Sequence, residues 1–304
     1  MNALEVQGLR KRYGDVLAVD GIDFTVERGE TFGILGPNGA GKTTTLEIIE
    51  GIRAPDAGSV TLDGLDALRE TRAVHERIGV QPQSSALIEH LTVEETLEIF
   101  AALYPRRASI DRLIDRLELG EKRRTVVEHL SGGQRQRLSV VVALVNDPQI
   151  VFLDEPTTGL DPQARHSVWE MVREMQAEDR TVILTTHYME EAEELCQRVA
   201  IMDYGRIIAL DTPKALVRSL DFENTIECSL DGGVGEEDLR ALPAVRGVRA
   251  QDGFYYLFTT DVAATLSSLM AVASRGEVGV RQLQVHTATL EDVFLAFTGR
   301  RLRE

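Results

Sequence analysis

One stretch near the N-terminus constrains the fold more than any other part of the chain. The apolar segment 31–35 has the pattern of a strand, and segment 43–51 has the pattern of a helix that a glycine closes. The loop between them, of the form G-x-x-x-x-G-K-[ST], reads Gly36, Pro37, Asn38, Gly39, Ala40, Gly41, Lys42 and Thr43. Glycines let such a loop curl around a phosphate, and the helix behind it points its positive end at the same group. A chance glycine turn is a poor alternative, because the loop follows a strand and opens a helix.

Two carboxylates follow a second buried strand, predicted over 150–154. Asp154 and Glu155 stand at the carboxyl end of this strand, the edge where open α/β sheets bind ligands. Asp154 is predicted to hold Mg²⁺ through water, and Glu155 to polarise the water that attacks a phosphate. An acidic pair that only caps a strand before Pro156 would explain the residues equally well in isolation. The phosphate-binding loop favours the chemical interpretation.

A third motif opens a predicted helix about a hundred residues after the loop. Its anion-binding residues are Ser131, Gly132, Gly133 and Gln134, preceded by Leu130. Backbone donors and the positive end of the helix make this a second phosphate site. One chain therefore carries two phosphate sites and one set of catalytic carboxylates.

These three motifs, in this order and spacing, resemble those of the ATP-binding subunits of ABC transporters. The resemblance covers roughly residues 3 to 218. It implies a P-loop NTPase with ATPase activity coupled to transmembrane transport, and ATP and Mg²⁺ as cofactors. Lys42 would then contact the β- and γ-phosphates, Thr43 and Asp154 the metal, and Thr44 the nucleotide.

The resemblance also assigns catalytic residues by their motif context. His187, after the predicted strand 181–186, matches the family histidine that contacts the γ-phosphate and positions the water. Gln83 matches the glutamine that touches Mg²⁺ or water and senses the membrane partner, with Gln81 as a competing candidate. Without that context, a histidine at a strand end is more often structural.

Two further residues match binding positions of the family. Tyr13 matches the aromatic residue that stacks on adenine, and Asp161 matches the loop that communicates across the dimer. The plainer alternatives are a tyrosine packed at a strand end and a solvated turn before Pro162.

The partners also follow from the resemblance. In the family the two phosphate sites meet across a dimer, so one copy of each motif implies a homodimer with ATP at the interface. The longest apolar run, 140–145, is far shorter than the roughly 18 residues that span a bilayer. An integral membrane permease subunit is therefore a required partner. With no signal peptide visible either, we expect a peripheral protein on the cytoplasmic side of the cell membrane.

The C-terminal tail narrows the subfamily. Segments 289–294 and 298–300 resemble the tail of daunorubicin-resistance-type (ABC-2) exporters, which predicts export, including drug or lipid efflux. One rival is the ATPase subunit of an importer. A rival of another class is a non-transport ABC ATPase with a regulatory C-terminal domain, although repair members of that class carry coiled coils or zinc cysteines.

Composition excludes some other functions. The net charge of −16 argues against binding to nucleic acid, which needs clustered Lys and Arg. Cys196 and Cys228 have neither metal-ligand spacing nor a disulfide framework, so we interpret both as buried apolar residues.

Two domains are predicted. Residues 1–220 form an α/β ATP-binding domain of the ABC type, with a mixed sheet core, an antiparallel β subdomain and a helical subdomain at about 84–147. Residues 221–304 follow the order β-α-β-β-α-β, with a turn at Asp252-Gly253 and a last helix over 290–297. This order predicts a small ferredoxin-like α+β domain that stabilises or regulates the dimer.

Overall fold

The computed structural model describes residues 2–84, 87–117, 120–231, 235–251, 253–275 and 279–298. The chain forms two compact units that divide after Thr212. Helix α8 (Pro213–Arg218) belongs to the second unit, where it packs against α11 (Leu290–Thr298). The predicted domain boundary at residue 220 follows this helix in the sequence. The assignment of 1–220 and 221–304 to two functional domains stays a prediction. None of the described helices is long and apolar enough to cross a membrane.

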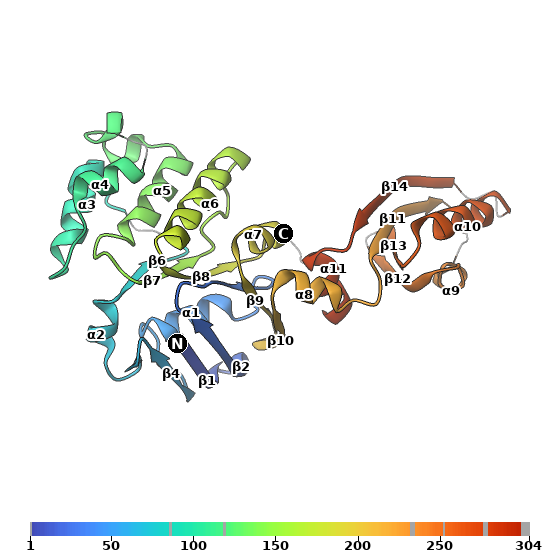
Figure 1. The fold of residues 1–304 in the computed structure, drawn as a ribbon, viewed down its shortest axis with the longest axis horizontal. Helices are drawn as coiled ribbons and strands as arrows, with labels where there is room; N and C mark the ends of the chain where they lie inside the picture. Colours follow the sequence, from blue (N-terminus) through green and yellow to red (C-terminus); the bar gives the residue numbers. More distant parts are fainter. Residues whose placement is uncertain are drawn as a thin grey trace. The chain divides into compact units, whose positions relative to one another are not determined.

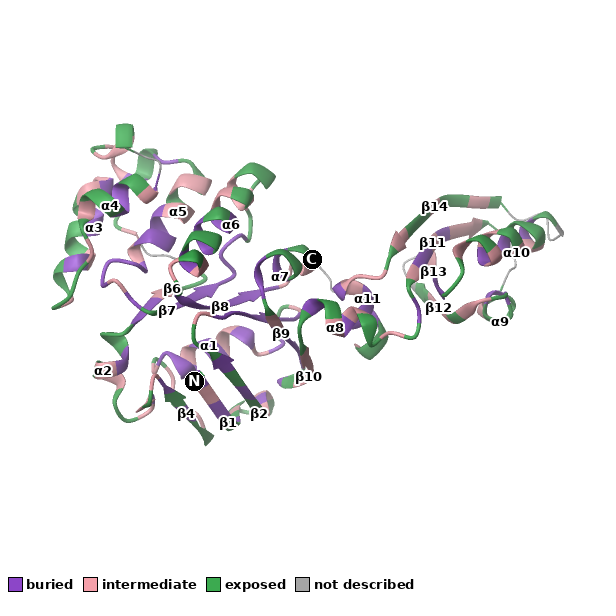
Figure 2. Cartoon of the chain, in the orientation of Figure 1, coloured by how far each residue is buried: buried purple, intermediate pink, exposed green. Residues whose placement is uncertain are grey.

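The first unit is built on a mixed sheet in the order β10-β9-β3-β8-β7-β6 (Figure 1). Strands β3, β6, β7, β8 and β9 are parallel, and β10 returns antiparallel to β9. Their bounds are β3 (Thr31–Leu35), β6 (Ile78–Gln81), β7 (Ile150–Asp154), β8 (Thr181–Thr186), β9 (Arg198–Asp203) and β10 (Arg206–Asp211). Every residue of β3, β7 and β8 is buried, as expected for parallel strands covered on both faces (Figure 2). The predicted strands 150–154 and 181–186 are confirmed with the same bounds.

An antiparallel sheet in the order β2-β1-β4-β5 packs beside this core. Its strands are β1 (Asn2–Tyr13), β2 (Val16–Glu27), β4 (Ala57–Leu62) and β5 (Leu65–Asp66). The ring of Phe24 stacks on that of Phe32 with centroids 5.4 Å apart, and α1 (Lys42–Ile49) adds Leu46, Ile48 and Ile49 to the same apolar cluster. The predicted mixed sheet core with an antiparallel β subdomain is thus confirmed.

A group of helices lies on the other side of the central sheet from β1 and β2 (Figure 1). It contains α3 (Val93–Ala102), α4 (Ile110–Arg116) and α5 (Gly132–Val142). The predicted capping box opens α3: Thr92 Oγ1 accepts from the backbone N–H of Glu95, and the Glu95 carboxylate accepts from that of Thr92. Three further helices of the first unit are α2 (Thr71–His75), α6 (Pro162–Ala177) and α7 (Met189–Leu195).

The second unit contains an antiparallel sheet in the order β12-β13-β11-β14. Its elements after α8 are β11 (Asn224–Asp231), α9 (Glu236–Arg240), β12 (Val245–Gln251), β13 (Phe254–Thr259), α10 (Val262–Arg275), β14 (Gly279–Thr287) and α11. Both this element order and this strand order are those of a ferredoxin-like fold. Ile226, Leu257 and Leu269 pack in one core, whereas Phe258 and Leu295 of α11 belong to a second cluster. Of the predicted turn, Asp252 lies outside the described residues, as do Gly299 and Arg300 of the tail motif.

Candidate active site

The phosphate-binding loop sits between β3 and α1, as predicted. Gly41 is the N-cap of α1 with a φ of +104°, a conformation that residues with a Cβ rarely adopt. A Cβ at Gly36 would collide with the carbonyl oxygen of Met202, and one at Gly41 with that of Ala18. Side chains at these positions would therefore distort the loop that leads into the N-terminus of α1. This geometry fits a phosphate.

Lys42 is the buried cation of the loop. Its side chain is about 3% exposed, and its Nζ donates to the carbonyl oxygens of Gly36 (2.8 Å) and Pro37 (3.2 Å). Nζ also lies 3.1 Å from Oε1 of Glu155, so the two residues form a buried ion pair. Charged groups as deeply buried as these are costly unless they are paired or bind a charged ligand.

The backbone of Glu155 is held in an unusual conformation. Its φ is +48°, in the left-handed region that non-glycine residues adopt at a cost of about 1–3 kcal/mol. Its N–H donates to Oγ1 of Thr185 (3.0 Å) and to the carbonyl oxygen of the same residue (3.2 Å). Strand β8 therefore fixes the direction in which the Glu155 carboxylate leaves β7.

Several side chains converge on the Glu155 carboxylate. Oε2 accepts a hydrogen bond from Thr158 Oγ1 at 3.0 Å and one from Gln83 Nε2 at 3.5 Å. Nδ1 of His187 lies 3.3 Å from the same oxygen, close enough for an ion pair but without the alignment of a hydrogen bond. The nearby His187 ring nitrogen, and then Lys42, lower the pKa of Glu155 to about 2. Glu155 is therefore ionised at neutral pH.

Asp154 and Thr43 lie together at the start of α1. Thr43 Oγ1 donates to Oδ1 of Asp154 across 3.4 Å, and Thr185 Oγ1 donates to the same oxygen. Burial raises the pKa of Asp154, and the bonds from Thr185 and Thr43 oppose that rise. A carboxylate and a hydroxyl are oxygen ligands of the kind that Mg²⁺ takes. The described residues contain no group of three or more His, Cys, Asp or Glu side chains that could hold a metal, so a cation here would also need phosphate oxygens and water.

The two glutamine candidates differ in their surroundings. Gln83 is exposed and reaches Glu155, whereas Gln81 is completely buried with its amide Nε2 bonded to the carbonyl oxygen of Pro82 at 2.6 Å. Of the two residues, only Gln83 has a contact with the carboxylate site in the described structure.

Three residues of the second phosphate motif, Ser131, Gly133 and Gln134, line a separate pocket of about 200 Å³, and Asp161 lines it as well. Ser131 Oγ accepts from the backbone N–H of Gln134, whose side chain accepts in return from the N–H of Ser131. Asp161 caps α6, its Oδ1 accepting from the N–H of Ala164 at 2.9 Å. Among the described residues, nothing bonds Ser131, Gly132, Gly133 or Gln134 to the phosphate-binding loop of the same chain.

Tyr13 stands at the end of β1 and is 40% exposed. Arg53 and Lys11 lie over its ring, with Cζ and Nζ at 5.3 and 5.6 Å from the centroid. Among the described residues, no ring contact or hydrogen bond joins Tyr13 to the phosphate-binding loop. Its role in binding adenine stays a prediction.

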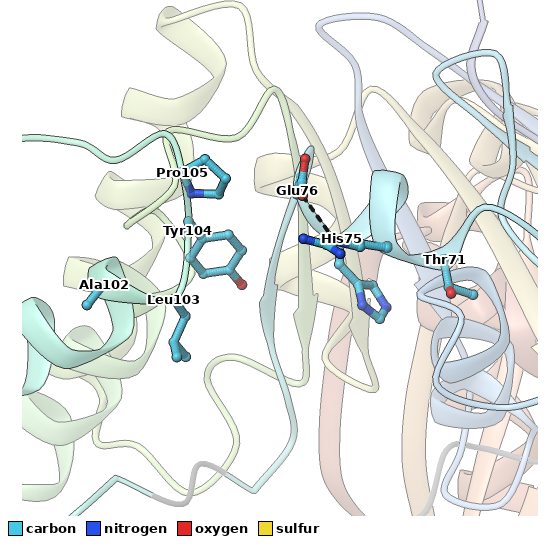
Figure 3. Close-up of a pocket in the computed structure, with 8 residues that line it drawn as sticks. Thr71, His75, Glu76, Ala102, Leu103, Tyr104 and Pro105 are labelled. Atoms are coloured by element: carbon cyan, nitrogen blue, oxygen red, sulfur yellow. Dashed lines mark ion pairs between the residues drawn. The ribbon is translucent and has the colours of Figure 1, made fainter.

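A larger pocket of about 490 Å³ contains none of the predicted site residues (Figure 3). His75 and Glu76 line it from α2 and the turn after it, and Leu103 and Tyr104 line it from the segment after α3. Arg72 and Glu76 form an ion pair across 3.7 Å, drawn as a dashed line in Figure 3.

Sequence reasoning missed the side chains that support the carboxylates. Thr185 bonds to both Asp154 and the backbone of Glu155, and Thr158 bonds to the Glu155 carboxylate. Thr185 belongs to the predicted strand 181–186, and Thr158 stands three residues before Asp161. Hydroxyl residues at strand ends beside a carboxylate pair are the signal that could have found them.

Comparison with known proteins agrees with the resemblance of the motifs to those of ABC transporters. Residues 19–158 match a family model described as ABC transporter. The chain is 41% identical to the Nod factor export ATP-binding protein I of Ralstonia nicotianae, over 99% of this chain and 95% of the relative. It is 42% identical to the protein of that name from Burkholderia pseudomallei, over 98% of each.

Solved structures resemble about 70% of the chain. An ATP-binding subunit of an ABC transporter matches with a TM-score of 0.64 and 30% identity, covering 71% of this chain and 92% of that one. A dimeric ATP-binding cassette in a post-hydrolysis state, bound to ADP and Pi, matches with a TM-score of 0.62 and 25% identity, covering 69% and 98%.

Proposed function

Because the chain belongs to the ATP-binding proteins of ABC transporters, we propose that it is the ATP-hydrolysing subunit of an exporter that works with a separate membrane subunit. The observation that carries this proposal is the Glu155 carboxylate, which lies between the buried ammonium of Lys42 and the ring of His187. The relatives are Nod factor export ATP-binding proteins, which supports export over import. A drug or lipid cargo stays a prediction.

The chain's own residues provide binding and proton transfer. Phosphate oxygens at the loop compete with Glu155 for the ammonium of Lys42, and so release one carboxylate oxygen. The released carboxylate accepts a proton from water. Contacts with His187 and Gln83 keep the carboxylate in its orientation. Thr43 and Asp154 would hold Mg²⁺, which offsets phosphate charge when bound.

The separate pocket of Ser131 and Gln134 supports a shared site. Because this pocket and the phosphate-binding loop are not joined within the described chain, we propose that each ATP lies between the loop of one chain and the Ser131 motif of a second copy. The match to a dimeric cassette supports this arrangement. Peripheral attachment to the cytoplasmic side of the membrane, through an integral membrane permease, is part of the same proposal.

The function is tested by replacing the proposed base. We expect Glu155→Gln to keep ATP binding but to lower kcat by at least about 100-fold, the usual contribution of a general base. Glu190→Gln, on an exposed residue of α7, is the matched control and should keep the parent rate. Turnover is measured as phosphate release, and binding with a fluorescent ATP analogue. A Glu155→Gln protein that hydrolyses ATP at nearly the parent rate would contradict the assignment.

A further inference from the structure

A buried carboxylate lies behind the candidate active site and has no role in the chemistry described so far. Glu191, in the first turn of α7, has none of its surface exposed to solvent. Its Oε1 accepts hydrogen bonds from Thr157 Oγ1 at 2.9 Å and from the indole Nε1 of Trp169 at 3.1 Å. Its Oε2 is buried without a partner in the described structure.

These contacts join the segments that carry Glu155 and His187. Thr157 is two residues after Glu155, and the next residue, Thr158, bonds to Oε2 of Glu155. On the other side, α7 begins directly after the loop that contains His187. Glu191 is thus attached to both loops, while Trp169 anchors it to α6.

A second connection runs through stacked side chains. The guanidinium of Arg165 lies 4.3 Å from the centroid of the Tyr188 ring, which lies 4.2 Å from the ring of His187. Nε of Arg165 is buried without a hydrogen-bond partner among the described residues, and the charge of Arg165 acts to lower the pKa of Glu191. Arg165, a side chain of α6, therefore fixes the orientation of the His187 ring through Tyr188.

The cost of burial argues that this carboxylate has a use beyond stability. Burial raises the pKa of Glu191, and the neighbouring polar groups of Thr186, Thr157 and Trp169 oppose that rise. An apolar residue of similar size is often at least as stabilising as a buried charge. What an apolar side chain lacks is the directional pair of bonds to the loop and to the indole.

We propose that Glu191 is a positioning residue for ATP hydrolysis. It ties the loop after Glu155 to the helix that follows His187, and so keeps Nδ1 of His187 beside the Glu155 carboxylate. The inference rests on the proposed ATPase function.

The test compares Glu191→Ala, Glu191→Gln and the control Glu190→Ala in the full chain. We expect Glu191→Ala to lower kcat by at least about 10-fold with the KM for ATP within twofold of the parent, because the phosphate-binding loop is untouched. Glu191→Gln should recover most of that rate, since its amide oxygen can accept from Thr157 and Trp169. Glu190→Ala should match the parent.

Trp169 gives an independent readout, because it is the only tryptophan in the sequence. We expect Glu191→Ala to shift the emission of this indole, and Glu190→Ala to leave it unchanged. If Glu191→Ala does not fold, Thr157→Val removes one donor with little change in volume, and it should also lower kcat at constant KM.

The outcomes separate the two proposals. A folded Glu191→Ala or Thr157→Val protein with kcat within twofold of the parent would overturn the inference, as would a rise in KM at constant kcat. A parent chain that does not hydrolyse ATP would instead overturn the proposed function, and the inference with it. Loss of rate in Glu191→Ala, with recovery in Glu191→Gln, supports both.

Discussion

At the scale of single residues, two buried carboxyl groups of the first unit, Glu155 and Glu50, have pKa values shifted in opposite directions. Glu155 has a cationic neighbour and a low pKa, whereas Glu50, at the C-terminal end of α1, is 4% exposed and its carboxylate has no hydrogen bond in the described structure. Burial, and then Asp154, raise the pKa of Glu50 to about 8. The folded chain therefore holds a proton on Glu50 at neutral pH.

This proton makes stability depend on pH. Because the folded-state pKa of Glu50 lies above its ordinary value of 4.5, its contribution to stability is complete below pH 4.5 and is lost as the pH rises to about 8. Each pKa unit corresponds to about 1.4 kcal/mol. We expect Glu50→Gln to stabilise the fold at pH 8 by roughly 2–4 kcal/mol relative to the parent, and to show little of this gain at pH 5.

Urea unfolding at pH 5 and pH 8 measures the difference. Glu98→Gln, on an exposed residue of α3 that does not act on Glu50, serves as the control and should show no such gain with pH. An equal effect of Glu50→Gln at both pH values would contradict the shifted titration.

At the scale of elements, local sequence signals predicted much of the fold. The strands 150–154 and 181–186 could be predicted because apolar runs end at polar residues, and the capping box of Thr92 and Glu95 because it depends on a four-residue spacing. The phosphate-binding loop likewise carries its own strand and helix signals.

The parts of the site that could not be predicted from the sequence depend on packing between distant segments. The Lys42–Glu155 ion pair needs β3 and β7 to lie on either side of β8, and the burial of Glu50 needs α1 to cover the sheet. Nothing in the residues around Lys42 or Glu50 encodes these neighbours. Glu191 was missed for the same reason, since its partners stand on α6 and on the loop after β7.

The edge strand β6 offers a test of packing between elements. Gly79 lies against the end of α5, so closely that a Cβ would collide with the carbonyl oxygen of Ala143. We expect Gly79→Ala to destabilise the chain by about 1–3 kcal/mol through overpacking. It should also lower the ATPase rate, because β6 leads to Gln83.

Gly120→Ala is the matched control, since nothing lies within 4 Å of the added Cβ. Thermal unfolding compares the two variants. Equal stability of both would contradict the close contact between β6 and α5.

At the scale of the whole molecule, the predicted catalytic residues all lie in the first unit. The second unit has its own apolar cores, and residues 221–304 carry none of the predicted site residues. We expect a chain that ends after Thr212 to bind ATP with an affinity within about threefold of the full chain. It should form the nucleotide-dependent dimer less readily if the second unit stabilises the dimer.

Calorimetry and light scattering measure the two effects. A chain cut after Leu220 is the comparison, because it keeps α8 but removes its partner α11. A folded chain ending at Thr212 that cannot bind ATP would show that the second unit belongs to the nucleotide site.

The central claim is that ATP is shared between the Lys42 loop of one chain and the Ser131 motif of another. The most direct measurement is the mass of Glu155→Gln protein in solution by light scattering, with and without ATP and Mg²⁺. We expect ATP to double the mass. In the Glu155→Gln background, Ser131→Arg should abolish the doubling of mass while each chain still binds ATP. The control Ser59→Arg, at an exposed position of β4, should leave the doubling unchanged. A Ser131→Arg protein that still dimerises with ATP, or a Glu155→Gln protein that binds ATP as a monomer, would contradict the shared site.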